Sequence, residues 1–431
     1  MQTIKFPQKN DWNTILARPN IELEEMDEVV NQIFKEVKAD GDAALKKYTW
    51  FYDRIRINEL VVSQEEIDNS EQLISDELKN AIQFAAKNIE KFHRAQKVES
   101  EIIETTKGVT CWRKFTAIDK VGLYIPGGSA PLFSTVLMLG IPARIANCKE
   151  VILCTPPNKN GEINPAILYA CKLVGIKQVF KLGGIQAIGA MAIGTESVPN
   201  VFKIFGPGNQ FVTAAKQTAS KLGVAIDMPA GPSEVLVMAD ESAVPEFVAA
   251  DLLSQAEHGP DSQVILLSWN EQLLNSVQLE LAKQLKNISR VAIATRALEN
   301  SKMILVKSSQ EALEISNQYA PEHLILSVKN EDEILNGIQN AGSVFIGNYT
   351  PESAGDYASG TNHTLPTNGY AKSFSGVGLG SFMKSITFQK ITREGLENLG
   401  PSIEIMAEAE QLEAHKNAVN VRLNKICKEQ A

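Results

Sequence analysis

The order of apolar segments from Val121 onward constrains the fold of this chain more than any other feature. Short apolar runs that fit strands, such as VGLYIPG and EVILCTPP, alternate with stretches of helical periodicity, such as TVLMLGIPARIANC and PAILYACKLVG. Strands of about five residues separated by helices of about 10 to 15 residues predict βαβ units and a parallel sheet. A second alternation begins at Phe247, in which we expect strands at SQVILLSW, RVAIAT, MILVKS and AGSVFIG. We therefore expect an α/β fold with two open, mostly parallel sheets.

Segments of a different character flank these alternations. Residues 21 to about 100 and the tail from about Pro401 have apolar positions at helical spacing, which predicts helical N-terminal and C-terminal extensions. The stretch 347–380 is rich in Gly, Ser, Thr and Asn and has almost no apolar periodicity. A loop of this length inside a compact domain is usually functional or disordered.

The bulk composition excludes several classes of function. A chain of 431 residues exceeds the size at which one core keeps growing, so two or more domains are expected. The net charge is −9 with scattered basic residues, which argues against nucleic acid as a partner. We expect no membrane partner either, because no apolar stretch approaches the ~20 residues that span a bilayer. The N-terminus has no leader pattern and the five cysteines form no CxxC pair, so we expect a cytoplasmic protein whose mature chain starts near Met1.

Only five histidines occur in the chain, so their positions are informative. In LLSQAEHGP, Gln255 and His258 lie three residues apart at the end of a helical pattern, just before a Gly-Pro break. Residues at this spacing share a helix face and can converge on one point, which fits half of a metal site. A hydrogen-bonded surface pair is the more frequent meaning of the same spacing.

Two further pairs carry groups suited to acid/base chemistry. Glu322 and His323 precede an apolar run in YAPEHLIL. Adjacent side chains diverge on a helix or a strand, so these two would flank a bound molecule rather than bond to one another, although an exposed pair before a strand is an equal alternative. Asp356 and His363 lie in the loop PESAGDYASGTNH, whose composition suits a site that closes over a ligand.

The other two histidines have ordinary surroundings. His93 lies in a charged helical pattern, where we expect it at the surface, and His415 lies in the middle of a helical pattern, where we expect it to be solvated.

Two glycine motifs lie at expected strand ends. In IFGPGNQ, which contains Asn209, backbone N–H groups at a helix start can face an anionic or carbonyl group. In YIPGGS, paired glycines allow close backbone approach, and Tyr124 can stack on a ring. Neither motif has the full GxGxxG spacing of a dinucleotide fingerprint, so we expect Rossmann-like units of an incomplete type. Taken alone, each motif is better explained as a structural turn.

Taken together, nine ordered blocks between about residue 20 and residue 425 resemble the histidinol dehydrogenase family. The blocks are VGLYIPGGSAPLFSTVLMLGIPA, GGIQAIGAMAIGT, IFGPGNQFVTAAK, DMPAGPSEVLV, DLLSQAEHGPDSQ, YAPEHLIL, AGSVFIG, TPESAGDYASGTNHTLPT and EAHKNAV. The resemblance implies an NAD-dependent, zinc-containing dehydrogenase at the end of histidine biosynthesis. Such an enzyme oxidises L-histidinol to L-histidine through L-histidinaldehyde, with two NAD.

The same resemblance implies roles for individual residues. The implied ligands of one zinc ion per subunit, which orients the imidazole and amino nitrogens of the substrate, are Gln255, His258, Asp356 and His415. His323 would be the general base of both hydride transfers, and Glu322 would activate water to attack the aldehyde. Besides the zinc ligands and His323, the implied substrate contacts are Ser233, His363 and Glu410, and the implied NAD contacts are Tyr124, Gln186 and Asn209.

The resemblance also implies a homodimer in which the tail of one subunit reaches into the site of the other. Glu410 and His415 would then come from the partner. Residues five apart on a continuous helix point about 140° from each other, so these two share a pocket only if the helix starts or bends between them.

The expected domain organisation has four parts. Residues 1–22 form an N-terminal helical extension, and residues 23–118 with 235–375 form a first α/β domain that carries most zinc and catalytic residues. Residues 119–234 form a second α/β domain that binds NAD, and residues 376–431 form a C-terminal dimerisation tail.

Three other functions fit parts of this sequence less well. A thiolate-dependent aldehyde dehydrogenase needs an exposed, electropositive cysteine, whereas Cys148 and Cys154 lie on apolar segments. A zinc hydrolase can activate water without a nicotinamide, but it leaves the glycine motifs without a role. A binding or regulatory protein of the same fold has no need of every zinc and acid/base residue.

Overall fold

The computed structural model describes residues 1–19, 23–127 and 131–430. The chain forms two compact units, one made of Met1–Gln96 and Ile118–Phe382 and the other of Lys97–Ala117 and Met383–Ala431. None of the described helices combines the length and the apolar character needed to cross a bilayer.

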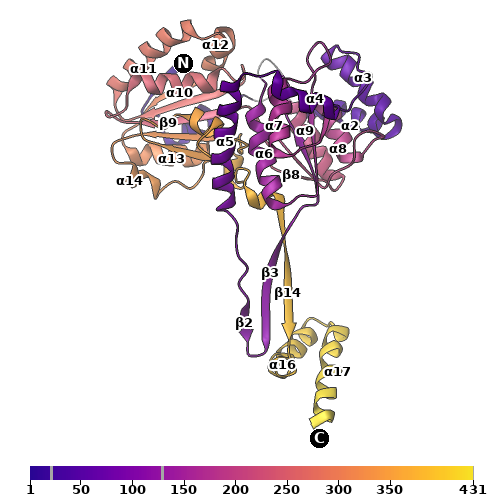
Figure 1. The fold of residues 1–431 in the computed structure, drawn as a ribbon. Helices are drawn as coiled ribbons and strands as arrows, with labels where there is room; N and C mark the ends of the chain where they lie inside the picture. Colours follow the sequence, from indigo (N-terminus) through magenta and orange to yellow (C-terminus); the bar gives the residue numbers. More distant parts are fainter. Residues whose placement is uncertain (20–22, 128–130, 431) are drawn as a thin grey trace. The chain divides into compact units, whose positions relative to one another are not determined.

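A six-stranded parallel sheet forms one half of the first unit (Figure 1). Its strand order is β1-β11-β10-β9-β12-β13, and every neighbouring pair is parallel. The strands are β1 (Gln2–Lys5), β9 (Glu234–Ala239), β10 (Gln263–Ser268), β11 (Lys302–Leu305), β12 (His323–Ser327) and β13 (Ser343–Ile346). Every residue of the three central strands β9, β10 and β12 is buried, as expected for a parallel sheet covered on both faces.

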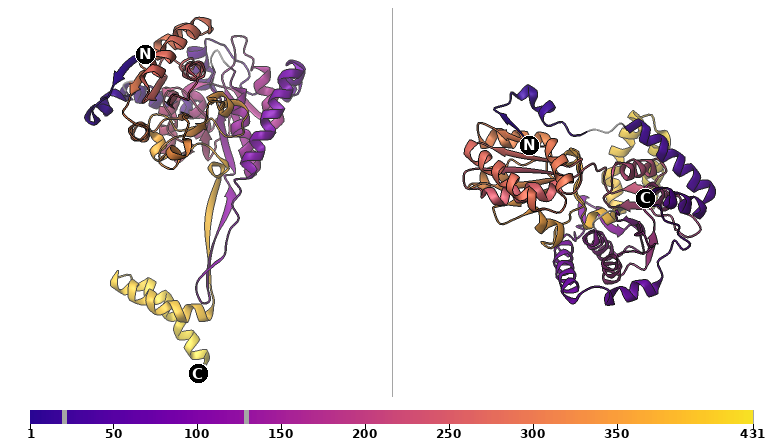
Figure 2. Two further views of the ribbon diagram at one scale, coloured as in Figure 1. Left: turned by 90° about the vertical axis from the view of Figure 1, so that its left-hand side faces the viewer. Right: turned by 90° about the horizontal axis from the view of Figure 1, so that it is seen from above.

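Helices cover both faces of this sheet, as the right-hand view of Figure 2 shows. Val235 and Val237 of β9 point to one face, whereas Leu236 and Met238 point to the other. The first face packs against α10 (Pro245–Ala256), α11 (Glu271–Gln284) and α12 (Val291–Glu299). The second face packs against α1 (Trp12–Ile15), α13 (Ser309–Tyr319) and α14 (Glu331–Leu335).

A five-stranded parallel sheet, in the order β6-β5-β4-β7-β8, forms the other half of the first unit. Its strands are β4 (Lys120–Tyr124), β5 (Glu150–Thr155), β6 (Gln178–Lys181), β7 (Lys203–Phe205) and β8 (Ala225–Ile226). Its helices are α6 (Phe133–Ala146), α7 (Pro165–Val174), α8 (Gly184–Ile193) and α9 (Gln210–Lys221). The N-terminal helices α2 (Leu23–Asp40) and α3 (Asp42–Asp53) share a core with α8 and α9. The two parallel sheets confirm the predicted α/β fold, and the four-part domain division stays a prediction.

The first unit contains further helices besides those that cover the two sheets. They are α4 (Gln64–Asn69), α5 (Asp76–Arg94), α15 (Glu352–Tyr357) and the 3₁₀ helices η1 (Lys9–Asp11), η2 (Ser70–Gln72), η3 (Leu285–Asn287), η4 (Tyr370–Lys372) and η5 (Leu379–Phe382).

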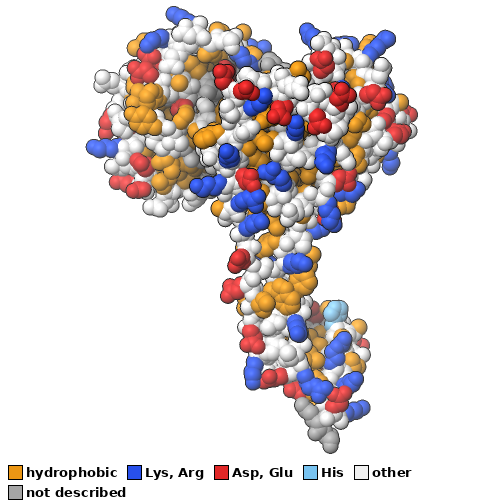
Figure 3. Space-filling view, viewed as in Figure 1, with side chains coloured by type: hydrophobic (Ala, Val, Ile, Leu, Met, Phe, Trp, Pro, Cys, Tyr) orange, Lys and Arg blue, Asp and Glu red, His pale blue; other side chains and the backbone are white. Residues whose placement is uncertain are grey.

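The second unit is built from a three-stranded antiparallel sheet and two helices. The strands, in the order β14-β3-β2, are β14 (Met383–Ile391), β3 (Val109–Ala117) and β2 (Ile103–Thr106). The helices α16 (Arg393–Ala409) and α17 (Glu413–Gln430) pack together, with Leu423 against Gly400. Apolar side chains are exposed on this unit (Figure 3), among them Ile386, Ile405, Met406 and Leu412.

Several sequence predictions about local structure were wrong. The segment 1–22 is not wholly helical, because Gln2–Lys5 forms strand β1 and pairs with β11, a partner far away in sequence that no local pattern reveals. RVAIAT lies largely in helix α12 rather than in a strand, because a short apolar run has no periodicity that separates a strand from a buried helix turn. The expected loop 347–380 contains α15. His93 is buried, not exposed, because it lies on the face of α5 that also buries Ala85 and Ile89.

Candidate functional site

The predicted acid/base residues lie at the amino edge of the six-stranded sheet. Glu234 begins β9, and His323 begins the neighbouring strand β12, where it pairs with Val235. Helix α10 follows β9 and runs back along the sheet, so its last turn brings Gln255 to the same edge. Ligands of open α/β sheets usually bind at the carboxyl ends of the strands, so this sheet uses the opposite edge.

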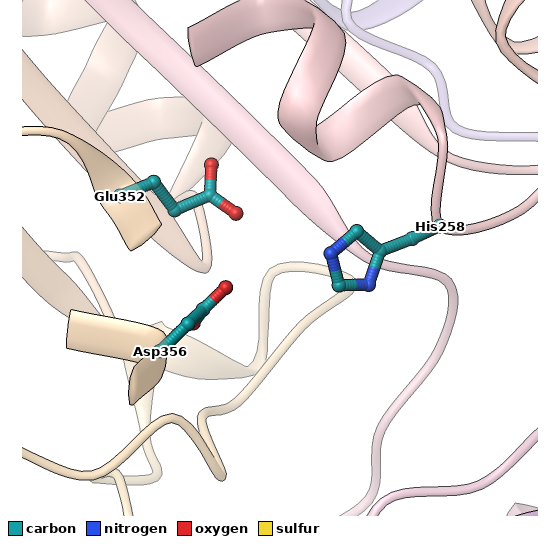
Figure 4. Close-up of side chains that lie close together, drawn as sticks. All are labelled: His258, Glu352 and Asp356. Carbon is teal, nitrogen blue, oxygen red and sulfur yellow. The ribbon is translucent and has the colours of Figure 1, made fainter. Parts of the chain in front are cut away.

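Three side chains at this edge form a candidate cation site (Figure 4). One ligand atom each from His258, Glu352 and Asp356 lies within 4.8 Å of the other two. Glu352 and Asp356 are four residues apart on α15, so they share one helix face. Glu352 is not among the site residues predicted from sequence, although the spacing of the two carboxylates in PESAGDY is a local signal for it.

Gln255 is fully buried beside this cluster. Its amide contacts the Glu352 carboxylate and lies 3.0 Å from the backbone N–H of Glu234. With its nitrogen toward Glu352, the amide donates to the carboxylate, and its oxygen shares the N–H of Glu234 with Oε2 of Glu322. The opposite orientation turns two acceptor oxygens toward each other, which is favourable only when a proton on Glu352 or a cation lies between them. A glutamine oxygen, an imidazole and a carboxylate are a donor set that suits zinc, so these residues fit the metal that the family resemblance implies.

The carboxylates of the site are held where their charge is costly. Burial raises the pKa of Asp356 to about 7, and burial together with neighbouring carboxylates raises the pKa values of Glu322 and Glu352 well above the ordinary range. Asp251, one turn before Gln255 on α10, has a pKa raised to about 7 by burial. A bound cation would offset the repulsion among these groups.

His323 has one ring nitrogen satisfied and one free. Nδ1 lies 3.1 Å from the carbonyl oxygen of Glu234, which can only accept, so Nδ1 carries the proton. Nε2 is buried without a hydrogen-bond partner among the described residues and lies 3.7 Å from Oδ1 of Asp356. Burial lowers the pKa of His323 to about 3, which keeps the ring neutral and leaves Nε2 able to accept a proton.

Glu322, like His323, is hydrogen-bonded to the main chain of Glu234. Its Oε2 accepts a hydrogen bond of 2.9 Å from the N–H of Glu234. The distance from Oε2 to Nδ1 of His323 is 3.7 Å, which is longer than a hydrogen bond. The expectation that Glu322 and His323 do not bond to each other is confirmed.

His363 has both ring nitrogens engaged by the protein. Nδ1 donates to the carbonyl oxygen of Asp356 at 2.9 Å, and the hydroxyl of Thr135 on α6 lies 2.9 Å from Nε2. The next residue back, Asn362, donates to the carbonyl of Met138 at 2.6 Å. The loop that follows α15 is thereby tied to a helix of the five-stranded sheet. Ser233, another implied substrate contact, is partly exposed directly before β9.

Glu410 and His415 belong to the second unit, where both are exposed. Helix α16 ends before Glu410, Gln411 has a φ of +60°, and α17 begins at Glu413. The tail is therefore two helices rather than the one helical stretch expected from about Pro401, and the chain bends between Glu410 and His415, as a shared pocket for these two residues requires.

The three implied NAD contacts lie at the carboxyl edge of the five-stranded sheet. Tyr124 ends β4 and is buried, with its hydroxyl accepting from the N–H of Gly184 at 3.0 Å. Gln186 on α8 is buried with Oε1 unpaired among the described residues, and Asn209 caps the start of α9. Gly128 of the YIPGGS motif lies outside the described residues.

The GPGN loop at this edge is fixed by close contacts. Gly206 has a φ of +128°, and a Cβ atom there would lie 2.0 Å from the carbonyl oxygen of Tyr124. Asp227 accepts from the N–H of Gly206 at 2.8 Å, and Lys216, ion-paired with Asp227, donates to the carbonyl of Gly206 at 2.9 Å. These contacts hold the backbone of Gly206 against β4 and α9.

Comparison with known proteins points to one family. A family model described as histidinol dehydrogenase matches residues 16–423. The histidinol dehydrogenase of Bacteroides thetaiotaomicron is 59% identical over 424 residues, covering 98% of this chain and 99% of the relative. That of Shigella sonnei is 53% identical, covering 98% of each chain. The crystal structure of histidinol dehydrogenase from Elizabethkingia anophelis matches with a TM-score of 0.97 and 57% identity, over 99% of this chain and 98% of that one. The chain belongs to the histidinol dehydrogenase family.

Proposed function

We propose that this protein oxidises L-histidinol to L-histidine through L-histidinaldehyde, with reduction of two NAD, as the final steps of histidine biosynthesis. The observation that carries the proposal is the free Nε2 of His323 beside the cation-binding cluster of His258, Glu352 and Asp356. A neutral base next to a cation site suits a substrate with an imidazole, an amine and a hydroxyl on one short chain.

In the first oxidation, the carbinol carbon loses a hydride to NAD while the hydroxyl proton passes to Nε2 of His323. The ring can take this proton because Nδ1 already donates to the Glu234 carbonyl, which also stabilises the imidazolium that forms. The products are the aldehyde, NADH and a proton that leaves through His323.

In the second oxidation, water adds to the aldehyde and the hydrate loses a hydride to a second NAD. Glu322 would take the proton of the attacking water, and burial, which raises the pKa of its carboxyl group, makes its carboxylate a stronger base than an exposed one. His323 would take the hydroxyl proton of the hydrate, as in the first step. The overall reaction consumes one water and two NAD, and yields two NADH.

Zinc is the metal we propose for the site. Gln255, His258 and Asp356 would hold it from this unit, together with His415 of the partner subunit. When bound, the ion would fix the imidazole and amino nitrogens of the substrate, and it would undergo no redox change. Ser233, His363 and Glu410 are proposed to contact the substrate, and Tyr124, Gln186 and Asn209 to contact NAD.

A homodimer with an exchanged tail is part of the proposal. Its support is the exposed break between α16 and α17 that carries Glu410 and His415, together with the exposed apolar side chains of the same unit. We also propose a cytoplasmic location, which suits an enzyme of amino-acid biosynthesis with five free cysteines.

A thiolate mechanism is disfavoured by the surroundings of the cysteines. Burial raises the pKa of Cys148 to about 12 and that of Cys154 further, so neither thiol ionises near neutral pH. Variants with alanine at both positions should keep full activity.

The stoichiometry of oxidation tests the proposed function. Purified zinc-loaded protein is given a limiting amount of L-histidinol with excess NAD, and NADH is counted by absorbance. About two NADH per histidinol, lost on chelation and restored by zinc, is the expected result. One NADH per histidinol would limit the enzyme to the alcohol step, and none would overturn the proposal.

A further inference from the structure

Glu234 contacts both acid/base residues through its main chain. Its N–H donates to Oε2 of Glu322 at 2.9 Å, and its carbonyl oxygen accepts from Nδ1 of His323 at 3.1 Å. The peptide groups of a single residue therefore set the direction of both side chains. A small displacement of Glu234 would turn Glu322 and His323 together.

The side chain of Glu234 is anchored away from these two groups. It is buried, with only 2% of its surface exposed, and its carboxylate receives Nε and Nη2 of Arg18 at 2.5 and 2.8 Å. The N–H of Asn368 adds a third hydrogen bond of 2.8 Å. A forked arginine contact fixes the carboxylate in orientation as well as in position.

Arg18 also binds the segment that precedes His323, through Tyr319. Its Nη2 donates to the carbonyl of Tyr319 at 2.8 Å, and its guanidinium lies 3.9 Å from the centroid of the Tyr319 ring. Tyr319 ends α13, three residues before Glu322. One guanidinium thus joins the start of β9 to the end of α13, the two chain segments that meet at the acid/base pair.

Among the described residues, the hydrogen-bond partners of the Glu234 carboxylate are Arg18 and the N–H of Asn368, not the side chains of Glu322 or His323. Burying a charged pair where an apolar pair would pack brings little stability of its own, so orientation is the physical reason to keep it. We propose that Arg18 and Glu234 are positioning residues, which hold Glu322 and His323 in their working directions through the main chain of Glu234. The proposal rests on the function proposed above, in which those two residues move protons.

Steady-state kinetics of Arg18 variants form the first test. Arg18→Ala should lower kcat with histidinol roughly 10- to 100-fold, as expected for a misdirected base, with zinc content and the KM for NAD within about twofold of wild type. Added guanidinium should restore part of kcat. Glu234→Gln, which keeps the shape, should lose kcat in the same direction and to a smaller extent.

A matched control lies in the same N-terminal segment. Lys5 on β1 forms an exposed ion pair of 2.5 Å with Glu271, far in sequence from the acid/base residues. Lys5→Met should keep kcat and show no response to guanidinium. The proposal is overturned if Arg18→Ala keeps the kcat of wild type. It is also overturned if the loss of kcat in this variant is fully explained by the fraction of protein that is unfolded or that lacks zinc.

A second test needs no turnover. With only five histidines in the chain, ¹⁵N-histidine labelling can assign the ring of His323. The shifts should show a proton on Nδ1 and none on Nε2 in wild type, and a mixture of tautomers in Arg18→Ala and Glu234→Gln. An unchanged tautomer in both variants overturns the positioning role. A changed tautomer in a protein that oxidises no histidinol would support the positioning role while the proposed function failed.

Discussion

Nε2 of His323 lies 3.7 Å from Oδ1 of Asp356, while Nδ1 of the same ring lies 3.1 Å from the carbonyl of Glu234. The free side of the base therefore faces a carboxylate of the candidate cation site. A substrate held by a cation at Asp356 would present its hydroxyl close to Nε2. The base His323 and the candidate cation site therefore lie next to each other at the amino edge of the six-stranded sheet.

Replacement of the base should affect both oxidations. His323→Gln keeps a polar side chain but removes the proton acceptor, so kcat should fall roughly 10²- to 10⁴-fold with histidinol and with histidinaldehyde alike. The KM for NAD should stay near wild type, because NAD is proposed to bind at the other sheet. Steady-state kinetics with each substrate measure this, and a loss confined to one step would contradict a shared base.

Replacement of the water-activating carboxylate should separate the two steps. In Glu322→Gln the alcohol step keeps His323, whereas the attack of water on the aldehyde loses its base. The yield of NADH per histidinol should fall from about two toward one, and the aldehyde should become available to a hydrazine trap. A variant that still gives two NADH without trapped aldehyde would show that another group activates water.

The local patterns of the chain predicted much of this architecture. The two alternations from Val121 onward are local signals, and both produced the expected parallel sheets. The ladder of β14 with β3 was not predicted, because its paired residues, such as Phe388 and Trp112, are far apart in sequence and no turn joins them. The prediction of a strand at RVAIAT was wrong because an apolar run this short fits either a strand or a buried helix.

The residues of the site also differ in whether a local sequence pattern predicts them. The three-residue spacing of Gln255 and His258 on one helix turn is readable from sequence, and the four-residue spacing of Glu352 and Asp356 could have been read in the same way. The contact of Arg18 with Glu234 joins residues 216 positions apart in the sequence, so no local pattern predicts it. Sequence patterns therefore identify ligands on one element more readily than the residues that orient them.

The unpredicted carboxylate Glu352 should matter for metal affinity. It is buried beside His258 and Asp356, so Glu352→Gln removes the negative charge that the carboxylate would place beside a bound cation, while keeping the shape of the side chain. Zinc affinity, measured by competition with a chromogenic chelator, should fall roughly 10- to 100-fold. Glu241→Gln, at an exposed carboxylate, is the matched control and should bind zinc as wild type does. Unchanged affinity in Glu352→Gln would exclude Glu352 from the cation site.

Asp53 should make stability depend on pH. Burial raises its pKa from 3.8 to about 6, and its Oδ2 has no partner among the described residues. Because the folded pKa is the higher one, the stability that Asp53 contributes is present below about pH 3.8 and is lost as the pH rises through about 6. The free energy of unfolding of Asp53→Asn minus that of wild type should therefore grow across this window and level off above it. Urea denaturation of zinc-loaded protein at a series of pH values measures the difference, and a flat difference would contradict the shifted pKa.

Gly206 should be required for NAD binding rather than for histidinol binding. A Cβ atom at this position would lie 2.0 Å from the carbonyl of Tyr124, so Gly206→Ala must push the GPGN loop away from β4. Gly223→Ala is the control for backbone strain alone. Gly223 also has a positive φ, of +87°, but nothing lies within 4 Å of the added Cβ atom, so this variant has the strain without the clash. Both variants should lose about 1 to 3 kcal/mol of stability through strain. Only Gly206→Ala should also raise the KM for NAD about tenfold or more, since a loop displaced by about 1 Å no longer presents its backbone to the cofactor. Equal NAD affinity in the two variants would mean that the GPGN loop is a structural turn and that the cofactor binds elsewhere.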